Sequence, residues 1–299
     1  GPSDADSGDL GHLMSAADAA CYMAKDGGRN RVHSYEQDDT TLAERYGQMQ
    51  WIQRIESALA ERRFRLFYQM IQPVEGEASG RELLCEILLR MLDRKGQLIE
   101  SSAFLSAAER YHLITRLDRW VITTAFAALV EARRHTDRPN VLFALNVSAQ
   151  SIADETFLPF LVEALASSSV EPRRVAFEIT ESAAIGKLDL VQHLMATLGE
   201  LGCRFILDGF GSGLSSLAYL RNLSFDFLKI DGELVQHLGD DPVQRAMVES
   251  IHQVGHAMGM RTIAQWVETR HHFDTLRAMG IDYAQGHWLG RPQAFVHDV

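Results

Sequence analysis

The sequence has few cysteines, and they stand far apart. Cys21, Cys85 and Cys203 form no CxxC pair and no Cys/His spacing typical of a zinc site. An odd number of scattered cysteines is typical of a reducing compartment, so we expect a cytoplasmic location for this part of the protein. Each cysteine is expected to be a small buried apolar side chain.

Basic residues are scarce relative to acidic ones. Lys and Arg number 29 against 40 Asp and Glu, which gives a formal net charge of −11. Binding to duplex nucleic acid depends on Lys and Arg that neutralise phosphates, so this balance argues against a duplex partner. The net negative charge is still compatible with a small anionic ligand, because a bound divalent cation can make the local electrostatic potential positive.

Long apolar runs are missing as well. No stretch reaches the ~20 apolar residues that a membrane-spanning helix needs, and no signal peptide begins the chain. Gly1, Pro2 and Ser3 have the sequence of a cleaved-tag scar. We therefore expect the chain to start inside a longer protein, which leaves a membrane anchor upstream open.

Residues 1–36 hold too little regular structure for a domain. The stretch from Ser15 to Lys25 predicts a short amphipathic helix, which Gly27 and Gly28 end. Residues 31–35 predict one strand. One helix and one strand cannot enclose a core, so we interpret 1–36 as the end of a domain whose remainder is absent.

Residues 37–63 predict a long linker helix. Apolar side chains recur every three or four residues between Thr41 and Arg63, which gives one apolar stripe. Two interpretations fit this stripe: the helix packs on the domain that follows, or it pairs with a second copy of the chain. The following domain is itself another candidate surface for a homodimer.

Residues 64–299 predict an α/β fold, a (β/α)8 barrel of the TIM type. Short apolar strands alternate with helix-period stretches, the pattern of a parallel sheet covered by helices. Eight strands in about 230 residues fit a closed barrel better than an open sheet. The first two strands lack a clear helix between them, so the start of the barrel is expected to be irregular. The predicted strands are 66–69, 83–89, 141–146, 175–178, 205–208, 227–231, 262–265 and 283–286.

Polar side chains occupy these strands at or near their ends. One such residue alone is explained as a helix cap or an ion pair. The carboxyl ends of parallel strands meet at one rim of a barrel, however, so seven of them together favour a single site. The seven are Glu86, Asn146, Glu178, Asp208, Lys229, Gln265 and Gln285.

The chemistry of this set indicates a metal-dependent reaction at a phosphate ester. Glu86, Asn146, Glu178 and Asp208 offer hard oxygen ligands, which suit Mg²⁺ or Mn²⁺ better than zinc or copper. Lys229 is the cation in the set, and it could hold an attacking water or neutralise a phosphate oxygen.

Seven motifs follow one another along the chain: ExLxR at 86–90, NVS at 146–148, FEITES at 177–182, LDGFGSGLSS at 207–216, LKID at 228–231, AQWVET at 264–269 and QGHWLGRP at 285–292. With these motifs the chain resembles the EAL family of cyclic di-GMP phosphodiesterases over residues 42–292. Residues 1–36 resemble the end of a GGDEF diguanylate cyclase domain without the cyclase signature. The resemblance implies a parent protein with a GGDEF–EAL tandem and a sensor upstream.

The resemblance also implies a role for each site residue. Glu86, Asn146, Glu178 and Asp208 would bind the first metal, and Lys229 would contact the attacking water. Glu268 and Gln285 would support the site, and Glu181 would steady the loop after Asp208. Cyclic di-GMP would be contacted by Gln69, Leu88, Arg90, Asp208 and Gln285.

Two positions depart from the family pattern. The chain has Gly209 where the family has a second aspartate, and Gln265 where the family has the glutamate proposed as general base. Glycine offers no ligand, and an amide offers neither charge nor a useful proton acceptor. We therefore expect one metal site rather than two. Replacement of glutamate by glutamine to trap a substrate is a rival explanation of Gln265, but it leaves Gly209 unexplained.

Three functions follow from this pattern. The first is a cyclic di-GMP receptor with impaired catalysis, which the two departures favour. The second is an active phosphodiesterase that yields linear pGpG, which the first-metal set and Lys229 favour. The third is a protein-interaction module without ligand, which the helix 41–63 favours.

Overall fold

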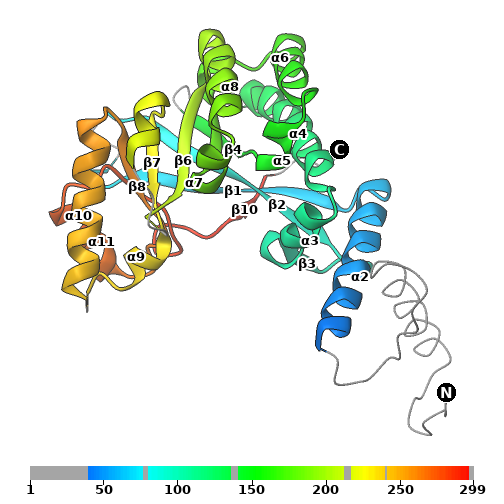
Figure 1. Cartoon of the computed structure of the whole chain (residues 1–299), viewed down its shortest axis with the longest axis horizontal. Coiled ribbons are helices and arrows are strands. Elements are labelled where there is room, and N and C mark those ends of the chain that lie inside the picture. The colour runs from blue at the N-terminus through cyan, green and yellow to red at the C-terminus, as the bar shows by residue number, and fades with distance from the viewer. Residues whose placement is uncertain (1–39, 77–79, 136–140, 212–216, 240, 296–299) are drawn as a thin grey trace, which may run out of the picture.

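A computed structural model describes residues 40–76, 80–135, 141–211, 217–239 and 241–295 of the 299-residue chain (Figure 1). Side chains are described from residue 50 onward, apart from 132–135 and 217. The predicted helix at 15–25, the predicted strand at 31–35 and Cys21 lie outside these ranges.

Eight strands close into a barrel, as predicted. The sheet order runs β1-β9-β8-β7-β6-β5-β4-β2, and a further pairing between β1 and β2 closes the ring. The strands are β1 (Phe64–Pro73), β2 (Leu83–Leu92), β4 (Val141–Asn146), β5 (Val175–Thr180), β6 (Arg204–Phe210), β7 (Phe227–Ile230), β8 (Arg261–Ala264) and β9 (Tyr283–Ala284).

The start of the barrel is irregular because β1 runs against its neighbours. β1 pairs antiparallel with both β2 and β9, and the remaining barrel strands pair in parallel. A short connection can only join antiparallel neighbours, whereas a parallel pair needs a crossover. Two short strands were not predicted: β3 (Leu98–Glu100) beside β2, and β10 (Gln293–Ala294) beside β1.

Helices cover the outside of this barrel. In Figure 1, α4, α6 and α8 lie together on one side of the sheet, and α10 and α11 lie on the other. Among the described residues, no helix combines the length and the apolar character needed to cross a membrane. The helices after β3 are α3 (Leu105–Arg110), α4 (Ile114–His135), α5 (Ala149–Ala153), α6 (Phe157–Ser167), α7 (Glu181–Gly186), α8 (Leu188–Leu201), α9 (Gly232–Gln236), α10 (Pro242–Ala257) and α11 (Arg270–Ala278).

The helix before the barrel, α2 (Thr40–Ala60), packs on it through its C-terminal part. Ile55 and Ala58 are fully buried in the main apolar cluster. The ring of Trp51 lies 6.3 Å from that of Phe104 in the segment before α3. The helix ends three residues earlier than predicted, and Arg62 then adopts a left-handed φ of 53°. Pairing of this helix with a second copy remains a prediction.

A layer of apolar side chains fills the barrel interior and sets the level of the site. β4 contributes two members and each other barrel strand contributes one, and a polar residue follows two positions after a member of the layer on β2 and on β4 to β9. Side chains two residues apart on a strand point to the same face, so the polar residues form the next layer toward the C-terminal ends. The apolar layer consists of Ile71, Leu84, Leu142, Ala144, Ala176, Ile206, Phe227, Ile263 and Tyr283.

Candidate functional site

A buried lysine lies at the centre of the polar layer. Lys229 on β7 is fully buried, and its Nζ donates to Glu86 Oε2 at 2.8 Å and to Glu178 Oε2 at 2.7 Å. The two glutamates come from β2 and β5, which are four and two strands away from β7 in the barrel order. A buried charge is tolerated only when it is paired, and this geometry pairs one lysine with two carboxylates.

Glu86 receives two further hydrogen bonds from amide side chains. Asn146 Nδ2 donates to Glu86 Oε1 at 2.9 Å, and Gln285 Nε2 donates to Glu86 Oε2 at 2.6 Å. Gln285 Nε2 also lies 3.2 Å from Gln69 Oε1 on β1, the residue directly opposite Glu86 in the β1–β2 register. The structure thus brings together six predicted site residues, namely Glu86, Lys229, Glu178, Asn146, Gln285 and Gln69.

The two glutamates differ in their protonation behaviour. Burial opposes the charge of Glu86, but Lys229 and the hydrogen bonds from Gln285 and Asn146 outweigh burial and lower the pKa of this carboxyl. Glu178 has the lysine alone as a donor, so burial, together with the nearby charge of Glu86, raises its pKa well above the usual value. The opposing carboxylates raise the pKa of Lys229 despite its burial, so it remains a cation.

The donor set fits a divalent cation. Glu178 Oε1 is buried and has no hydrogen-bond partner, and the same holds for Gln285 Oε1. Three carboxyl groups, those of Glu86, Glu178 and Asp208, face one lysine in this layer, and the pKa values of Glu178 and Asp208 are raised. A bound Mg²⁺ or Mn²⁺ would give the unpartnered buried oxygens a partner and would favour ionised carboxylates.

The other half of the mouth holds fewer charges. Asp208 near the end of β6 accepts a hydrogen bond of 2.9 Å from Gln265 Nε2, which follows β8. Burial raises the pKa of the Asp208 carboxyl. The amide therefore places a hydrogen-bond donor against this carboxylate, where a glutamate would place a second negative charge. Gly209 beside it has a left-handed φ of 68°.

Trp266 is an unusual neighbour of Gln265. Its φ of 54° lies in the left-handed region, which large residues rarely adopt. The indole is half exposed and lies over Gly232 at the start of α9, where an added Cβ would come within 2.1 Å of the ring. Gly232 therefore makes room for the indole, a contact that the sequence pattern does not predict.

The remaining predicted site residues lie at different distances from this layer. Glu181 is buried at the start of α7 and accepts a 3.0 Å hydrogen bond from Tyr219, which follows the loop after β6. Arg90 and Leu88 lie on β2 beyond Glu86, and Arg90 donates to the carbonyl of Leu89. Glu268 is exposed, and no hydrogen bond among the described residues joins it to the cluster. Sequence reasoning missed Tyr219, which carries no motif signal of its own.

Comparison with known proteins was made on sequence and on structure. The family model described as "EAL domain" matches residues 52–292. The cyclic di-GMP phosphodiesterase PdeB of Shewanella oneidensis is 36% identical over 282 residues, 94% of this chain and 32% of that protein. The bifunctional diguanylate cyclase/cyclic di-GMP phosphodiesterase MucR of Pseudomonas aeruginosa is 33% identical over 282 residues, 94% of this chain and 40% of that protein.

A solved structure has the same fold. The structure described as "PaMucR Phosphodiesterase, c-di-GMP complex" superposes with a TM-score of 0.76 at 30% identity, and it covers 82% of this chain and 97% of that one. The chain spans about a third of the length of PdeB and 40% of MucR.

Proposed function

Because this chain belongs to the EAL domain family, we propose that it binds cyclic di-GMP at the barrel mouth and acts as a signalling receptor with impaired catalysis. The observation that carries this proposal is the difference between Glu178, whose Oε1 is buried without a partner, and Asp208, which is occupied by the Gln265 amide. The unpartnered oxygen of Glu178 is available to a cation. Gln265 places a neutral donor where the family has a charged base.

The first half of the mouth supports cation binding. Glu86, Asn146, Glu178 and Asp208 would hold one Mg²⁺ or Mn²⁺, which when bound would supply positive charge to a phosphate oxygen of the ligand. Asn146 donates through its Nδ2, so its carbonyl oxygen is the atom that it would offer to the ion. Lys229 stays protonated between two carboxylates and would orient a water molecule or a phosphate oxygen.

Four more side chains would contact the dinucleotide. Gln69 and Gln285 are buried and bonded to each other at the floor of the mouth. Arg90 brings a guanidinium that suits a phosphate or the edge of a guanine, because it donates several hydrogen bonds in one plane. Leu88 offers an apolar contact on the same strand. The Tyr219–Glu181 hydrogen bond would hold the loop after β6 in place.

Catalysis requires a second metal site and a general base in addition to the cation-binding residues of the first half. A two-metal site stabilises both the attacking and the leaving oxygen of a phosphate ester. Gly209 offers no ligand and Gln265 offers no base, so we expect turnover to fall by at least the ~10²–10⁴-fold typical of a lost general base. Ligand binding does not depend on either group.

Calorimetry with cyclic di-GMP in Mg²⁺ or Ca²⁺ tests the binding proposal. We expect saturable heat with the chain and a clear loss of affinity in Glu178→Gln. Glu163→Gln on the exposed face of α6 serves as a matched control and should bind like the wild type. Absence of heat at high-micromolar ligand would contradict binding and would favour the protein-interaction module.

A second candidate is an active phosphodiesterase, because the first-metal set and Lys229 are assembled. Overnight incubation of cyclic di-GMP with the chain and Mn²⁺ or Mg²⁺ distinguishes the two. Intact cyclic di-GMP supports the receptor, whereas linear pGpG above the level of a Glu86→Gln control supports the enzyme. For the parent protein, the similarity to bifunctional MucR supports a GGDEF domain upstream.

A further inference from the structure

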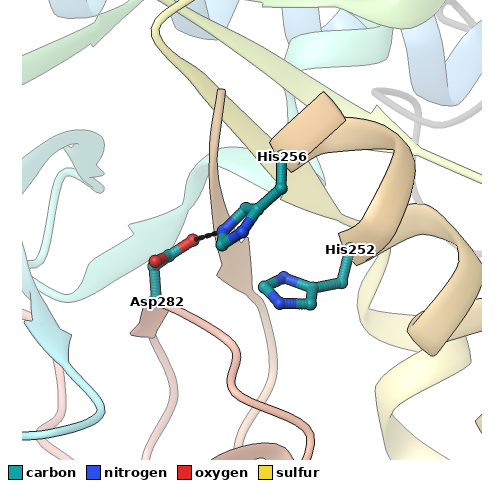
Figure 2. Close-up of side chains that lie close together, drawn as sticks. All are labelled: His252, His256 and Asp282. Atoms are coloured by element: carbon teal, nitrogen blue, oxygen red, sulfur yellow. Dashed lines mark hydrogen bonds and ion pairs between the residues drawn. The ribbon is translucent and has the colours of Figure 1, made fainter. Parts of the chain in front are cut away.

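Three metal-ligating side chains gather at the opposite end of the barrel from the mouth. His252 and His256 are on α10, one helical turn apart, and Asp282 directly precedes β9 (Figure 2). Their ligand atoms all lie within 4.8 Å of one another. Thr262, the second residue of β8, bonds to the cluster, whereas the mouth residue Gln265 follows the end of that strand. The cluster is therefore separate from the proposed cyclic di-GMP site.

The hydrogen bonds of this cluster centre on one carboxylate oxygen. His256 Nε2 lies 2.6 Å from Asp282 Oδ2, the contact drawn in Figure 2. Thr262 Oγ1 lies 3.2 Å from the same oxygen and 2.7 Å from His252 Nδ1, so a ring nitrogen of His252 faces the group as well. The two imidazole rings lie 4.1 Å apart between centroids.

We propose that His252, His256 and Asp282 form a binding site for a divalent transition-metal ion, with Zn²⁺ as the expected occupant. Two imidazoles and one carboxylate are a donor set that suits zinc and differs from the oxygen-only set of the mouth. A tetrahedral zinc ion with three protein ligands completes its coordination with water.

The geometry needs only small movements to hold an ion. Ligand atoms around a tetrahedral zinc lie about 3.3 Å apart, given bonds of about 2.0–2.1 Å. The ion would replace the hydrogen shared by His256 Nε2 and Asp282 Oδ2, and the rings would rotate slightly. The side chain of His256 is 46% exposed, which gives solvent and metal access to the cluster.

The surroundings of Asp282 orient it for this role. Its side chain is 5% exposed, its Oδ2 accepts the Thr262 backbone N–H at 2.9 Å, and its Oδ1 pairs with Arg81 at 3.1 Å. Hydrogen bonds to a ligand carboxylate of this kind fix its orientation and are typical of metal sites. Burial and the neighbouring His256 lower the pKa of His252, and Asp282 acts in the opposite direction.

An ion at this place would tie α10 to the start of β9. It would bind the folded chain and not the unfolded one, so it should raise the melting temperature. At a hundredfold excess over its dissociation constant we expect a rise of about 5 °C or more for a domain of this size.

Titration of the full chain with Co²⁺ and with Zn²⁺ tests the site. Co²⁺ bound by nitrogen and oxygen in a tetrahedral site gives visible d–d absorption bands, and Zn²⁺ should displace it. We expect one equivalent with these bands in the wild type and its loss in the double variant His252→Gln/His256→Gln. Glu178→Gln, which alters the mouth, and His193→Gln, an exposed histidine on α8, should both retain the bands.

The melting temperature gives a second readout. We expect Zn²⁺ to raise it in the wild type and in His193→Gln but not in the double variant, and circular dichroism checks that each variant is folded. Co²⁺ bands that persist in the double variant, bands that disappear in Glu178→Gln, or an equal Zn²⁺-induced rise in wild type and double variant would each overturn the proposal.

Discussion

On one half of the barrel mouth a buried lysine lies between two glutamates, and on the other half an amide lies against one aspartate. The first half holds Lys229, Glu86 and Glu178 in hydrogen bonds of 2.7–2.8 Å, with an oxygen of Glu178 left unpartnered. The second half holds Asp208 and Gln265, with Gly209 next to Asp208 near the end of β6. The comparison shows how one rim can combine a half held by a buried ion-pair network with a half held by a neutral amide.

The neutral half is also the half with unusual packing. Trp266 takes a left-handed backbone conformation and lies over Gly232, whereas the backbone of the charged half lies in regular strands. A residue with a strained backbone conformation keeps it only when the surrounding structure fixes it. Substitutions in the charged half should therefore change stability through charge. Substitutions in the neutral half should change stability through packing, or change turnover.

The largest effect on stability is expected from Lys229→Met. The variant leaves Glu86 and Glu178 buried without their cation, and removal of one partner of a buried ion pair costs about 3–5 kcal/mol. Urea unfolding at neutral pH measures this loss. Lys187→Met at the exposed end of α7 is the control and should change stability little. Exposed ion pairs contribute about 1 kcal/mol or less. A free energy of unfolding within about 1 kcal/mol of the wild-type value would therefore show that Lys229 does not stabilise the charged half.

Replacement of Gly209 and Gln265 in the neutral half by the acidic residues of the family pattern should raise turnover. In Gly209→Asp/Gln265→Glu we expect hydrolysis of cyclic di-GMP to increase at least about 100-fold, since a base and a second set of metal ligands return. Gly209 has a φ of 68°, which aspartate tolerates better than most residues, and an added Cβ meets nothing within 4 Å. Product formation with Mn²⁺ measures the gain. A double variant that binds the dinucleotide and stays inactive would refute our account of the second half.

The packing of the neutral half is tested by Gly232→Ala. The added Cβ would lie 2.1 Å from Trp266 Cδ2, so we expect a loss of about 1–3 kcal/mol from overpacking. In a Trp266→Gly background the same substitution should cost little, and thermal unfolding of the four proteins gives the coupling. Gly186→Ala, where an added Cβ meets nothing within 4 Å, is the control. An equal loss of stability from Gly232→Ala in both backgrounds would show that Trp266 does not contact the added Cβ.

The smallest effect is a pH dependence in the charged half. The pKa of Glu178 is raised by burial and by Glu86, so the folded state keeps this proton where the unfolded state, with a value near 4.5, has lost it. The unfolding free energy contributed by Glu178 therefore falls as pH rises from about 4.5 toward the folded pKa, by at most about 1.4 kcal/mol per unit.

Glu178→Gln cannot lose this proton. Its stability relative to wild type should therefore rise with pH across the same window, in chelator-treated buffer. Urea unfolding at a series of pH values between 4 and 8 measures the trend, and Glu163→Gln is the control without one. A flat difference would mean that Glu178 is ionised throughout.

The barrel and its polar layer could be predicted from the sequence because their signals are local. Successive side chains of a strand point to opposite faces, so Phe227 and Lys229, or Tyr283 and Gln285, lie on the same face at successive levels. This is why the eight strands and seven rim residues were found. β3 and β10, of three and two residues, were not predicted because they add to the edges of β2 and β1 and are not part of the strand–helix alternation.

The pairings within the site depended on the tertiary structure. Lys229 and Glu86 are 143 residues apart in the chain, and nothing local decides that Glu86 receives the amide donors while Glu178 keeps an unpartnered oxygen. In the same way the spacing of His252 and His256 is visible on one helix, but Asp282 joins them only because β9 starts beneath α10. The sequence by itself determined which side chains face the mouth, since strand geometry repeats every two residues. Only the closure of the barrel decided which of them share a proton, a hydrogen bond or a cation, because these interactions act over a few ångströms between distant segments.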